Sequence, residues 1–453
     1  MSAIENLLIA PVAFFISVWT GLVNLARLAG MAFAAIRAKG AFRSEFLARL
    51  ASVEGQRSVF AVLRAFMPNL LLSRSLVRSY ENNGTALVTR HDDVLDVLSR
   101  DQDFEVVYEP RMRRITDGEN FFLGMQPGWS YTRDVSAMRL AARRTDVEAI
   151  IVPRAQTRTE ELLETFPLRL DLPRDLTQRV PADMVATYFG TPGPSERQMI
   201  DWATIMFWYL FSDLGADPRV EEKALDAASE CRTYLDQAIA ARKADPTDTD
   251  DVLNRCLALQ KGEVPGMDDL GIRNNLIGLI IGAIPTLSKA SVFAMDELLR
   301  RPNALARAQK AAQTGNDRLL ENYIWEALRF NPHQPLVYRR AVRDAVIAPS
   351  TLRQRTIPKD AMVLAATLSA TFDTYAVSDA SVFQPFRTFE TYIPWGHGLH
   401  TCFGAAINRA VIPAMLKPVL MRPGLRRADG ADGEMDRSTP FPAHLVLEFD
   451  PGL

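Results

Sequence analysis

The sequence predicts a mainly α-helical protein with small β-sheets, built as one large domain behind a hydrophobic N-terminal segment. Long helical patterns dominate the chain beyond residue 128. Strand-like patterns are confined to two stretches, residues 78–89 and 335–370. Residues 265–300 predict one long helix that is apolar on every face, and such a helix belongs in the centre of a large domain.

The composition narrows the classes of function. The 453 residues carry a formal net charge of −2, so the chain lacks the basic field that would favour nucleic acid as a partner. Three cysteines exclude a disulfide scaffold and a zinc cluster built on CxxC pairs. A single thiolate ligand to a metal is compatible with this count.

Residues 1–45 are expected to form a hydrophobic segment, a possible membrane anchor, and residues 46–453 to form the main domain. Residues 6–26 carry no charge and are long enough to cross a bilayer, which needs about 20 apolar residues. Asn6, Pro11 and Asn24 interrupt this run, so a helix packed on the protein or lying flat on a membrane is the alternative. Four basic residues follow: Arg27, Arg37, Lys39 and Arg43. By the positive-inside rule they predict that the main domain lies on the cytoplasmic side.

Residues 78–100 predict a strand, a turn, a second strand and a helix. Asn83-Gly84 is typical of a hairpin turn, with Tyr80 on one side and the β-prone residues 87–89 on the other. A helix is expected to begin at His91.

The most informative segment is residues 394–404, with the sequence PWGHGLHTCFG. Its glycines let the backbone approach a flat cofactor closely, and a helical pattern follows Cys402, whose thiolate a helix N-terminus would favour. For an isolated cysteine of this kind, a buried structural thiol is the favoured interpretation. The spacing, however, resembles the haem-binding loop of the cytochrome P450 family, FGxGxHxCxG, with Trp395 in place of the first aromatic residue.

Two further motifs follow in the order of that family. Glu326 and Arg329 fit its ExxR helix and can pair on one helix face. Arg387, in the FxPxR element at 383–387, is the candidate third member of this structural group. The resemblance covers residues 55 to 450 and implies the family's triangular, mostly α-helical fold, with haem b between the long central helix and the helix that begins near the cysteine.

The resemblance also implies a set of haem contacts. Cys402 is expected to be the axial ligand of the iron. Trp129 and Arg133 fit the family's WxxxR helix, in which the pair meets a haem propionate, and a guanidinium matches carboxylate geometry. Arg339, with Arg340 as the alternative, and His400 are the expected further propionate contacts. The complete set of expected cofactor-binding residues is Trp129, Arg133, Arg339, Trp395, Gly398, His400 and Gly404.

The central helix departs from the family pattern at one catalytic position. The family has (A/G)Gx(D/E)T, whereas residues 282–286 read GAIPT. Thr286 is retained, but Pro285 replaces the acid that, in the family, relays protons with the threonine during dioxygen activation. Proline cannot relay a proton, and it removes one backbone hydrogen bond. A packing proline without effect on the chemistry is the alternative.

The resemblance predicts a monooxygenase that inserts oxygen into a small apolar or lipid substrate, with electrons from a separate ferredoxin and ferredoxin reductase. Because of Pro285, the alternative is a peroxide-using peroxygenase or a fatty-acid hydroperoxide isomerase, since such members of the family replace the acid–alcohol pair and carry a nearby proline. A haem sensor without catalytic activity is the alternative of another class. The expected pocket wall comprises residues 105–108, 120–125, Trp202, Phe207, Trp208 and Phe211, and the expected partner-docking charges are Arg409, Lys417, Arg422, Arg426 and Arg427.

Overall fold

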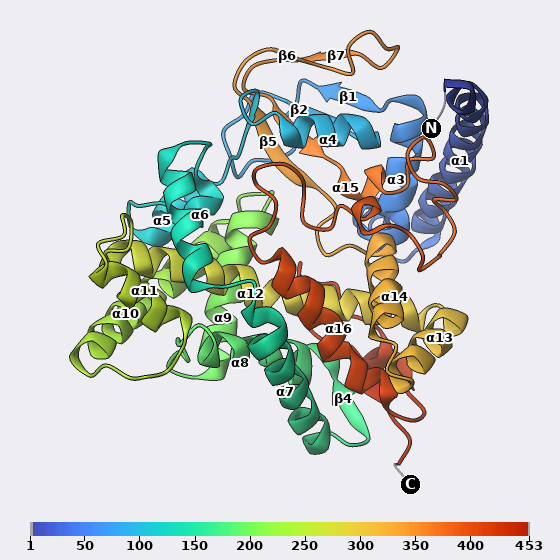
Figure 1. Ribbon diagram of the computed structural model, residues 1–453. Helices are drawn as coiled ribbons and strands as arrows, with labels where there is room; N and C mark the ends of the chain where they lie inside the picture. The colour runs from blue at the N-terminus through green and yellow to red at the C-terminus, as the bar shows by residue number, and fades with distance from the viewer. Residues whose placement is uncertain (1–2, 452–453) are drawn as a thin grey trace. The chain divides into compact units, whose positions relative to one another are not determined.

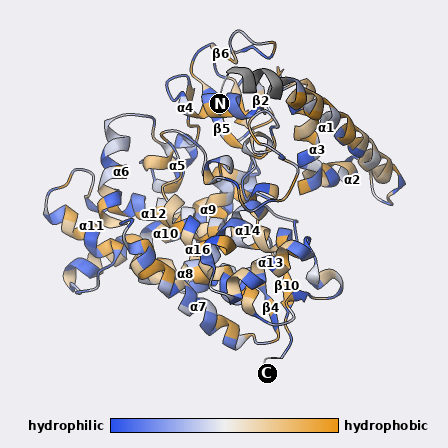
Figure 2. Cartoon of the chain, turned by 45° about the vertical axis from the view of Figure 1, so that its right-hand side comes forward, coloured by the Kyte–Doolittle hydropathy of each residue, from blue (hydrophilic) through white to orange (hydrophobic). Residues whose placement is uncertain are grey.

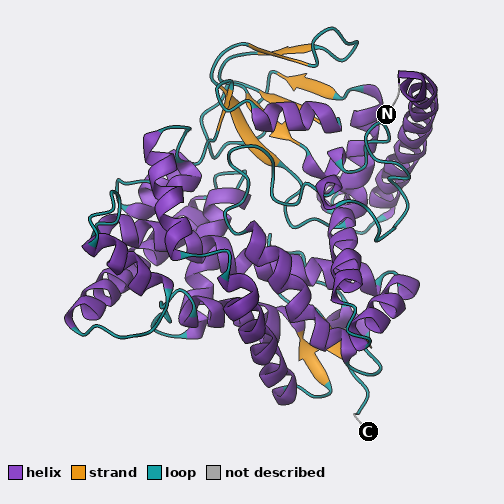
Figure 3. Cartoon of the chain, in the orientation of Figure 1, coloured by secondary structure: helices purple, strands orange, loops and turns teal. Residues whose placement is uncertain are grey.

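The computed structural model describes residues 3–451, with side chains from residue 11. Helices make up most of this chain and the strands are short, as Figures 1 and 3 show, so the prediction of a mainly α-helical protein with small sheets is confirmed. The chain forms two compact units, and each unit combines two stretches that are distant in sequence. The first comprises Met1–Val106 and Leu328–Thr401, and the second comprises Val107–Ala327 and Cys402–Leu453.

The first unit contains a five-stranded sheet in the order β1-β2-β8-β5-β3. Strand β2 pairs in parallel with β8, and the other neighbouring strands are antiparallel. Val94, Val97 and Leu98 of α4 are fully buried in a core cluster with the sheet residues Val88 and Val363. The elements of this unit after the N-terminal helices are β1 (Asn69–Leu72), β2 (Thr85–Val88), α4 (His91–Ser99), β3 (Phe104–Glu105), β5 (Val337–Ala341), β6 (Ala345–Ile347), β7 (Arg355–Ile357), β8 (Met362–Ala365), α15 (Thr367–Ala370) and a 3-10 turn (Phe389–Thr391).

The prediction of a hairpin at Asn83-Gly84 is wrong, because the residues before this turn do not form the expected first strand. The partner of β2 is β1, with Leu72 opposite Thr85, and the residues around Tyr80 form a loop. The backbone N–H of Asn83 donates to Asp360 O at 3.2 Å, and its side-chain amide donates to Lys359 O at 2.9 Å. These bonds to a distant segment replace the hairpin that the local signal favoured, whereas the helix predicted from His91 is confirmed as α4.

The second unit is mostly helical and has the long helix α12 (Asp269–Leu299) at its core. Asp268 caps this helix by accepting a hydrogen bond from Gly271 N at 2.7 Å, and residues 274–281 are all buried. The predicted long central helix is therefore confirmed. The remaining helices are α5 (Glu109–Thr116), α6 (Trp129–Ala141), α7 (Val152–Thr165), α8 (Arg179–Thr187), α9 (Glu196–Phe207), α10 (Pro218–Ala244), α11 (Val252–Lys261), α13 (Pro302–Gln313) and α16 (Ala405–Met421), with α14 (Asp317–Phe330) continuing into the first unit.

Shorter elements complete the second unit. A three-stranded sheet has the order β4-β10-β9. Its strands are β4 (Arg169–Asp171), β9 (Arg426–Arg427) and β10 (Val446–Glu448). Short 3-10 and π-helical turns lie at Phe122–Gly124, Val147–Ile151, Leu172–Thr177, Trp208–Ser212 and Gly430–Gly433.

The N-terminal segment forms one helix, α1 (Ala3–Arg37), which continues through Pro11. Two shorter helices follow, α2 (Phe42–Ala51) and α3 (Val53–Phe66), and α1 packs along α3 within the first unit (Figure 1). Among the described residues, two helices are long and apolar enough to cross a membrane: α1 over Pro11–Arg37, and α12, which is mostly buried inside the second unit.

Candidate active site

Cys402 lies in the turn that leads into α16, and Gly404 is the residue directly before the helix. Burial raises the pKa of the Cys402 thiol above its ordinary value, while the Gly404 backbone N–H and the Arg139 guanidinium act in the opposite direction. Arg139, from α6, lies 3.7 Å above the ring centre of Phe403. The free thiol is therefore protonated at neutral pH, and a metal that binds here must displace its proton.

Helix α12 exposes one small face in its otherwise buried middle. Between Asn274 and Val292, only Gly282, Ala283 and Thr286 keep appreciable accessible surface, and their spacing places them on one side of the helix. A Cβ atom on Gly282 would meet no atom within 4 Å. Since α12 packs against α16 in the same unit, this face and Cys402 together fit a flat cofactor held by a thiolate.

Pro285 sits inside α12 without interrupting it. Proline has no N–H, so the carbonyl of Ile281 lacks its usual helical donor at this position. The Thr286 hydroxyl donates to the carbonyl of Gly282, with a second contact of 3.4 Å to the carbonyl of Ala283. A threonine hydroxyl that donates to the backbone still has acceptor capacity for a water molecule.

Glu326 and Arg329 occupy neighbouring turns of α14, and both are buried. The Arg329 guanidinium donates to three carbonyls of the 371–382 segment, including Val382 O at 3.1 Å. Arg387 also donates to Val382 O at 3.1 Å. The structure thus brings Arg329 and Arg387, two members of the expected group, to one backbone carbonyl of the loop that leads towards the cysteine.

The loop before the cysteine is held by His400 and Gly398. The His400 ring contacts Asp101 through Nδ1 at 3.0 Å, and its side chain is almost fully buried. Gly398 has φ +76, and a Cβ at this position would lie 2.4 Å from the carbonyl oxygen of Leu98. Only glycine fits a left-handed turn in such close contact with a backbone. Trp395 stacks on Phe389, with ring centres 5.0 Å apart.

The remaining expected propionate contacts are divided between the two units, with Trp129 and Arg133 in the second and Arg339 and Arg340 in the first. Trp129 begins α6 with 73% of its surface exposed, and Arg133 pairs with Asp134 at 2.6 Å. Arg339 is buried on β5 and donates to Tyr338 O at 2.9 Å. Arg340, the alternative, pairs with Glu105 through Nε at 2.7 Å. The haem-contact roles of these residues stay predictions.

Sequence reasoning missed Arg139 and Asp101. Arg139 is ten residues beyond the WxxxR tryptophan and belongs to no motif, so only its contact with Phe403 identifies it. Asp101 is separated from His400 by almost 300 residues, and no local signal pairs them. Asp101 lies in the first unit together with His400, and Arg139 lies in the second unit together with Phe403.

The structure brings together some of the residues expected to line the substrate pocket. In the second unit, Phe211 lies 4.8 Å from Tyr108 and 4.7 Å from Phe207, and Phe207 lies 5.8 Å from Phe441, all between ring centres. Trp202 instead donates to Glu230 in α10 at 2.9 Å. The aromatic cluster of Tyr108, Phe207, Phe211 and Phe441 therefore forms an apolar surface to which the C-terminal stretch contributes.

A cysteine before a helix that packs against a long buried helix with one accessible face is typical of the class of haem-thiolate proteins. The chain belongs to the cytochrome P450 family, since the family model described as Cytochrome P450 matches residues 80–422. It is an enzyme of the cytochrome P450 monooxygenase type, and its cofactor is haem b.

Curated relatives and solved structures agree with this assignment. The chain is 27% identical to erythromycin C-12 hydroxylase of Saccharopolyspora erythraea over 353 residues, covering 76% of this chain and 83% of the relative. It is 25% identical to nocardicin C N-oxygenase of Nocardia uniformis subsp. tsuyamanensis, covering 82% of this chain and 88% of the relative. The open cytochrome P450 EryK from S. erythraea superposes with a TM-score of 0.71 at 23% identity, over 87% of this chain and 95% of that chain, and shows the shared fold.

Proposed function

We propose that this protein hydroxylates a small apolar molecule with electrons from a separate ferredoxin and ferredoxin reductase. The proposal rests on Cys402, which precedes α16, and on the accessible face of α12, the helix against which α16 packs in the second unit. The aromatic cluster of Tyr108, Phe207, Phe211 and Phe441 supports an apolar substrate, because ligand pockets are lined mainly by such side chains.

In this proposal the Cys402 thiolate would hold the haem iron, and the haem would supply the oxidising chemistry. Thr286 holds a water molecule through the lone pairs of its hydroxyl, and the carbonyl of Ile281, which Pro285 leaves without a helical donor, binds a second water. Proton delivery then depends on Thr286 and ordered water, since Pro285 offers no acid.

The basic residues beyond Cys402 offer little free charge for an acidic redox partner. Arg409 pairs with Glu321 at 2.6 Å and Lys417 with Asp317 at 2.7 Å. The others engage Asp450, Asp296 and the Leu163 carbonyl. A ferredoxin that docks here would have to displace these partners, so we expect electron transfer to weaken only modestly with rising salt.

The oxidant is tested by supplying reduced ferredoxin or hydrogen peroxide to the haem-loaded protein with one apolar substrate. We expect turnover with reduced ferredoxin, no turnover with peroxide alone, and none with either in Cys402→Ala. Turnover with peroxide and none with ferredoxin would replace the proposal by the peroxygenase alternative.

The peroxide-using alternative has one specific observation in its favour beyond Pro285. Lys289, one turn after Thr286, is 9% exposed, and its ammonium lies 5.4 Å from the ring centre of Phe293 and 5.5 Å from that of Phe441. It forms no ion pair among the described residues. A substrate carboxylate would provide the missing negative charge and could replace the lost acid beside the oxidant.

This second candidate is tested with a fatty acid and the alcohol of equal chain length, each with peroxide. The candidate requires faster turnover of the acid than of the alcohol in the native protein and in Lys289→Arg. It also requires that Lys289→Met lose this preference. Equal turnover of acid and alcohol in all three proteins excludes it.

A further inference from the structure

The outward face of α1 carries an unusual amount of apolar surface. Phe15 is 71% exposed and Trp19 is 68% exposed. The full set of large apolar side chains exposed on this helix is Val12, Phe14, Phe15, Ile16, Trp19, Leu22, Leu25, Phe33 and Ile36. Figure 2 shows the apolar residues distributed along α1. A continuous apolar surface of this size marks an interaction site.

The inward face of α1 is made of small and polar residues. Ala13, Ser17, Gly21 and Asn24 are buried at spacings of four, four and three residues. A Cβ on Gly21 would lie 2.6 Å from the Cβ of Ala65 in α3, so the two helices are in close contact. A helix of a water-soluble protein would bury its large apolar residues, whereas α1 buries the small ones and leaves the large ones outside.

Polar contacts fix this arrangement. The Ser58 hydroxyl of α3 donates to the Asn24 side chain at 3.0 Å in a buried position, and the Asn24 amide donates to the Thr20 carbonyl at 2.8 Å. The Thr374 hydroxyl donates to the carbonyl of Ala13 at 3.3 Å. If α1 left this site to cross a bilayer, Asn24 and Ser17 would enter the hydrocarbon without these partners, which is costly.

The charges within residues 6–44 have one sign. Residues 6–44 contain no acidic residue, and their basic residues Arg27, Arg37, Lys39 and Arg43 are all exposed. Basic residues next to an apolar helix face attract anionic lipid headgroups, with about 1 kcal/mol for each residue near the surface.

A cleft of about 1150 Å³ opens beside the same helix, between α1, α2 and α3. Its wall includes the apolar residues Val23, Met31 and Phe60, and Trp19 belongs both to this wall and to the exposed face. Arg27, Arg49 and Arg57 line it as well. Glu54 also lines the cleft and Arg49 pairs with Glu45 at 2.5 Å, so the cleft combines apolar walls with charged groups of both signs.

We propose that α1 lies in the interface of an anionic phospholipid bilayer while it stays docked on α3. In this arrangement α1 is a surface-bound element and does not span the membrane. The outer apolar side chains enter the headgroup and acyl boundary, and the basic residues contact the headgroups. This proposal does not depend on the reaction that the haem site performs.

Vesicle flotation of the haem-loaded protein tests the bilayer as the partner. We expect binding to vesicles that contain phosphatidylglycerol, weaker binding to pure phosphatidylcholine, and a loss of roughly tenfold or more in the variant Phe15→Gln/Trp19→Gln. The matched control is Leu352→Gln, which removes a fully exposed leucine elsewhere in the first unit and should leave binding unchanged. Haem content and the reduced carbon monoxide spectrum verify that each variant is folded. Absence of flotation of the native protein, or equal loss in the control, would overturn the proposal.

A disulfide between α1 and α3 distinguishes the surface-bound helix from a spanning one. The variant Asn24→Cys/Ser58→Cys places two thiols where the native side-chain oxygens are 3.0 Å apart. The oxidised protein should float as well as the reduced one and should be released by alkaline carbonate. Loss of flotation on oxidation, or resistance to carbonate, would show that α1 detaches and spans. A monodisperse dimer that does not bind vesicles would show that a second copy covers this face.

Discussion

Lys289 is a cation held in an apolar environment. Burial lowers the pKa of its ammonium group to about 8, and the positive charge of Arg437 acts in the same direction. Arg437 itself faces Asp296, which also pairs with Arg300 and Arg427, so this carboxylate is already shared by three guanidinium groups. The contact of the Lys289 ammonium with the Phe293 and Phe441 rings offsets only part of the free-energy cost of burying its charge.

We predict that Lys289→Met stabilises the substrate-free protein at pH 7 and that this gain disappears as the pH rises. Between about pH 8 and 10.5 the folded state binds fewer protons at Lys289 than the unfolded chain does, so the native protein gains stability with increasing pH. The advantage of the variant should fall from at most about 3 kcal/mol at pH 7 to near zero at pH 10.5. Urea unfolding of both proteins across this range measures it, and a difference that does not change with pH would contradict it.

We expect Cys402 to be the iron ligand among the three cysteines, because Cys231 and Cys256 are fully buried within α10 and α11. Burial raises the pKa of Cys231 and of Cys256 to about 12, and both lie inside helices, whereas Cys402 lies in the glycine-rich loop before α16. We predict that Cys402→Ala abolishes the long-wavelength carbon monoxide band of a thiolate-bound haem, because no other sulfur can replace it. Cys256→Ala is the control and should retain the band. Persistence of the band in Cys402→Ala would assign the ligand elsewhere.

At the scale of a loop, the two left-handed glycines before the cysteine differ in their surroundings. Gly396 has φ +75, and a Cβ added to it would meet no atom within 4 Å. A Cβ added to Gly398 would instead collide with the carbonyl oxygen of Leu98. We predict that Gly396→Ala costs about 1–2 kcal/mol from backbone strain alone. Gly398→Ala should cost more and lower the haem content, because the loop that carries His400 must move. Equal haem content in the two variants, measured per protein from the absorption spectrum, would show that the contact is unimportant.

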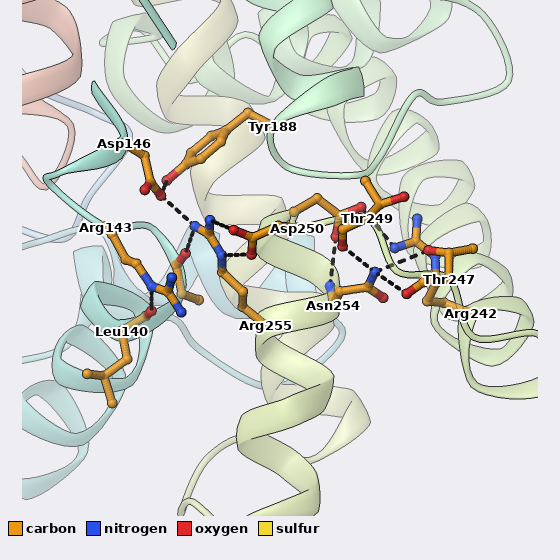
Figure 4. A network of polar contacts seen from close by, with 12 residues as sticks. Leu140, Arg143, Asp146, Tyr188, Arg242, Thr247, Thr249, Asp250, Asn254 and Arg255 are labelled. Atoms are coloured by element: carbon orange, nitrogen blue, oxygen red, sulfur yellow. Dashed lines mark hydrogen bonds and ion pairs between the residues drawn. The ribbon is translucent and has the colours of Figure 1, made fainter. Parts of the chain in front are cut away.

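At the scale of helices, α6, α8 and α11 are linked by the network in Figure 4. Arg255 of α11 pairs with Asp146 and with Asp250, both at 2.5 Å. The hydroxyl of Tyr188, the residue that follows α8, donates to Asp146 at 2.8 Å. Arg255 also donates to the Ala141 carbonyl at the end of α6 at 3.0 Å. The Arg255 and Asp146 side chains are almost fully buried, so each depends on the other for compensation of its charge.

We predict that Arg255→Met lowers the free energy of unfolding by roughly 3–5 kcal/mol, since it leaves Asp146 buried without its cation. Tyr188→Phe removes one hydrogen bond and should cost about 1 kcal/mol. Arg197→Met, which breaks an exposed helix pair with Asp201, is the control and should cost less than about 1 kcal/mol. Urea unfolding of the haem-loaded variants gives the three values, and equal costs for Arg255 and Arg197 would contradict the role of the network.

At the scale of the whole molecule, the sequence predicted what depends on local periodicity and spacing. The helix around 276–281 is apolar on every face because it is buried on every face, and Cys402 is recognisable because its glycines and histidine have fixed spacing. The strand partner of β2 was not predictable in this way. The Asn83-Gly84 turn signal is local, while the bonds that decide its conformation come from residues 359 and 360.

The same reason explains the site residues that were missed. Asp101 and Arg139 act through contacts with residues more than 250 positions away, and neither stands in a pattern that marks its purpose. The sequence showed that Pro285 departs from the family motif, but it did not show which residues of α12 beside it are accessible. The accessible face of Gly282, Ala283 and Thr286 emerges only when the other residues between Asn274 and Val292 are seen to be buried.

The parallel pairing of β2 with β8 has a consequence for synthesis of the chain. Thr85 lies opposite Met362, so the nascent first unit cannot complete its sheet until residue 365 has left the ribosome. At about 5–20 residues per second, the interval after β2 emerges is on the order of half a minute. During that time only β1 can cover β2, and an isolated pair of strands is marginally stable. Expression at a lower temperature or with chaperones that hold exposed strands should therefore increase the yield of this protein more than that of a fold whose units are continuous in sequence.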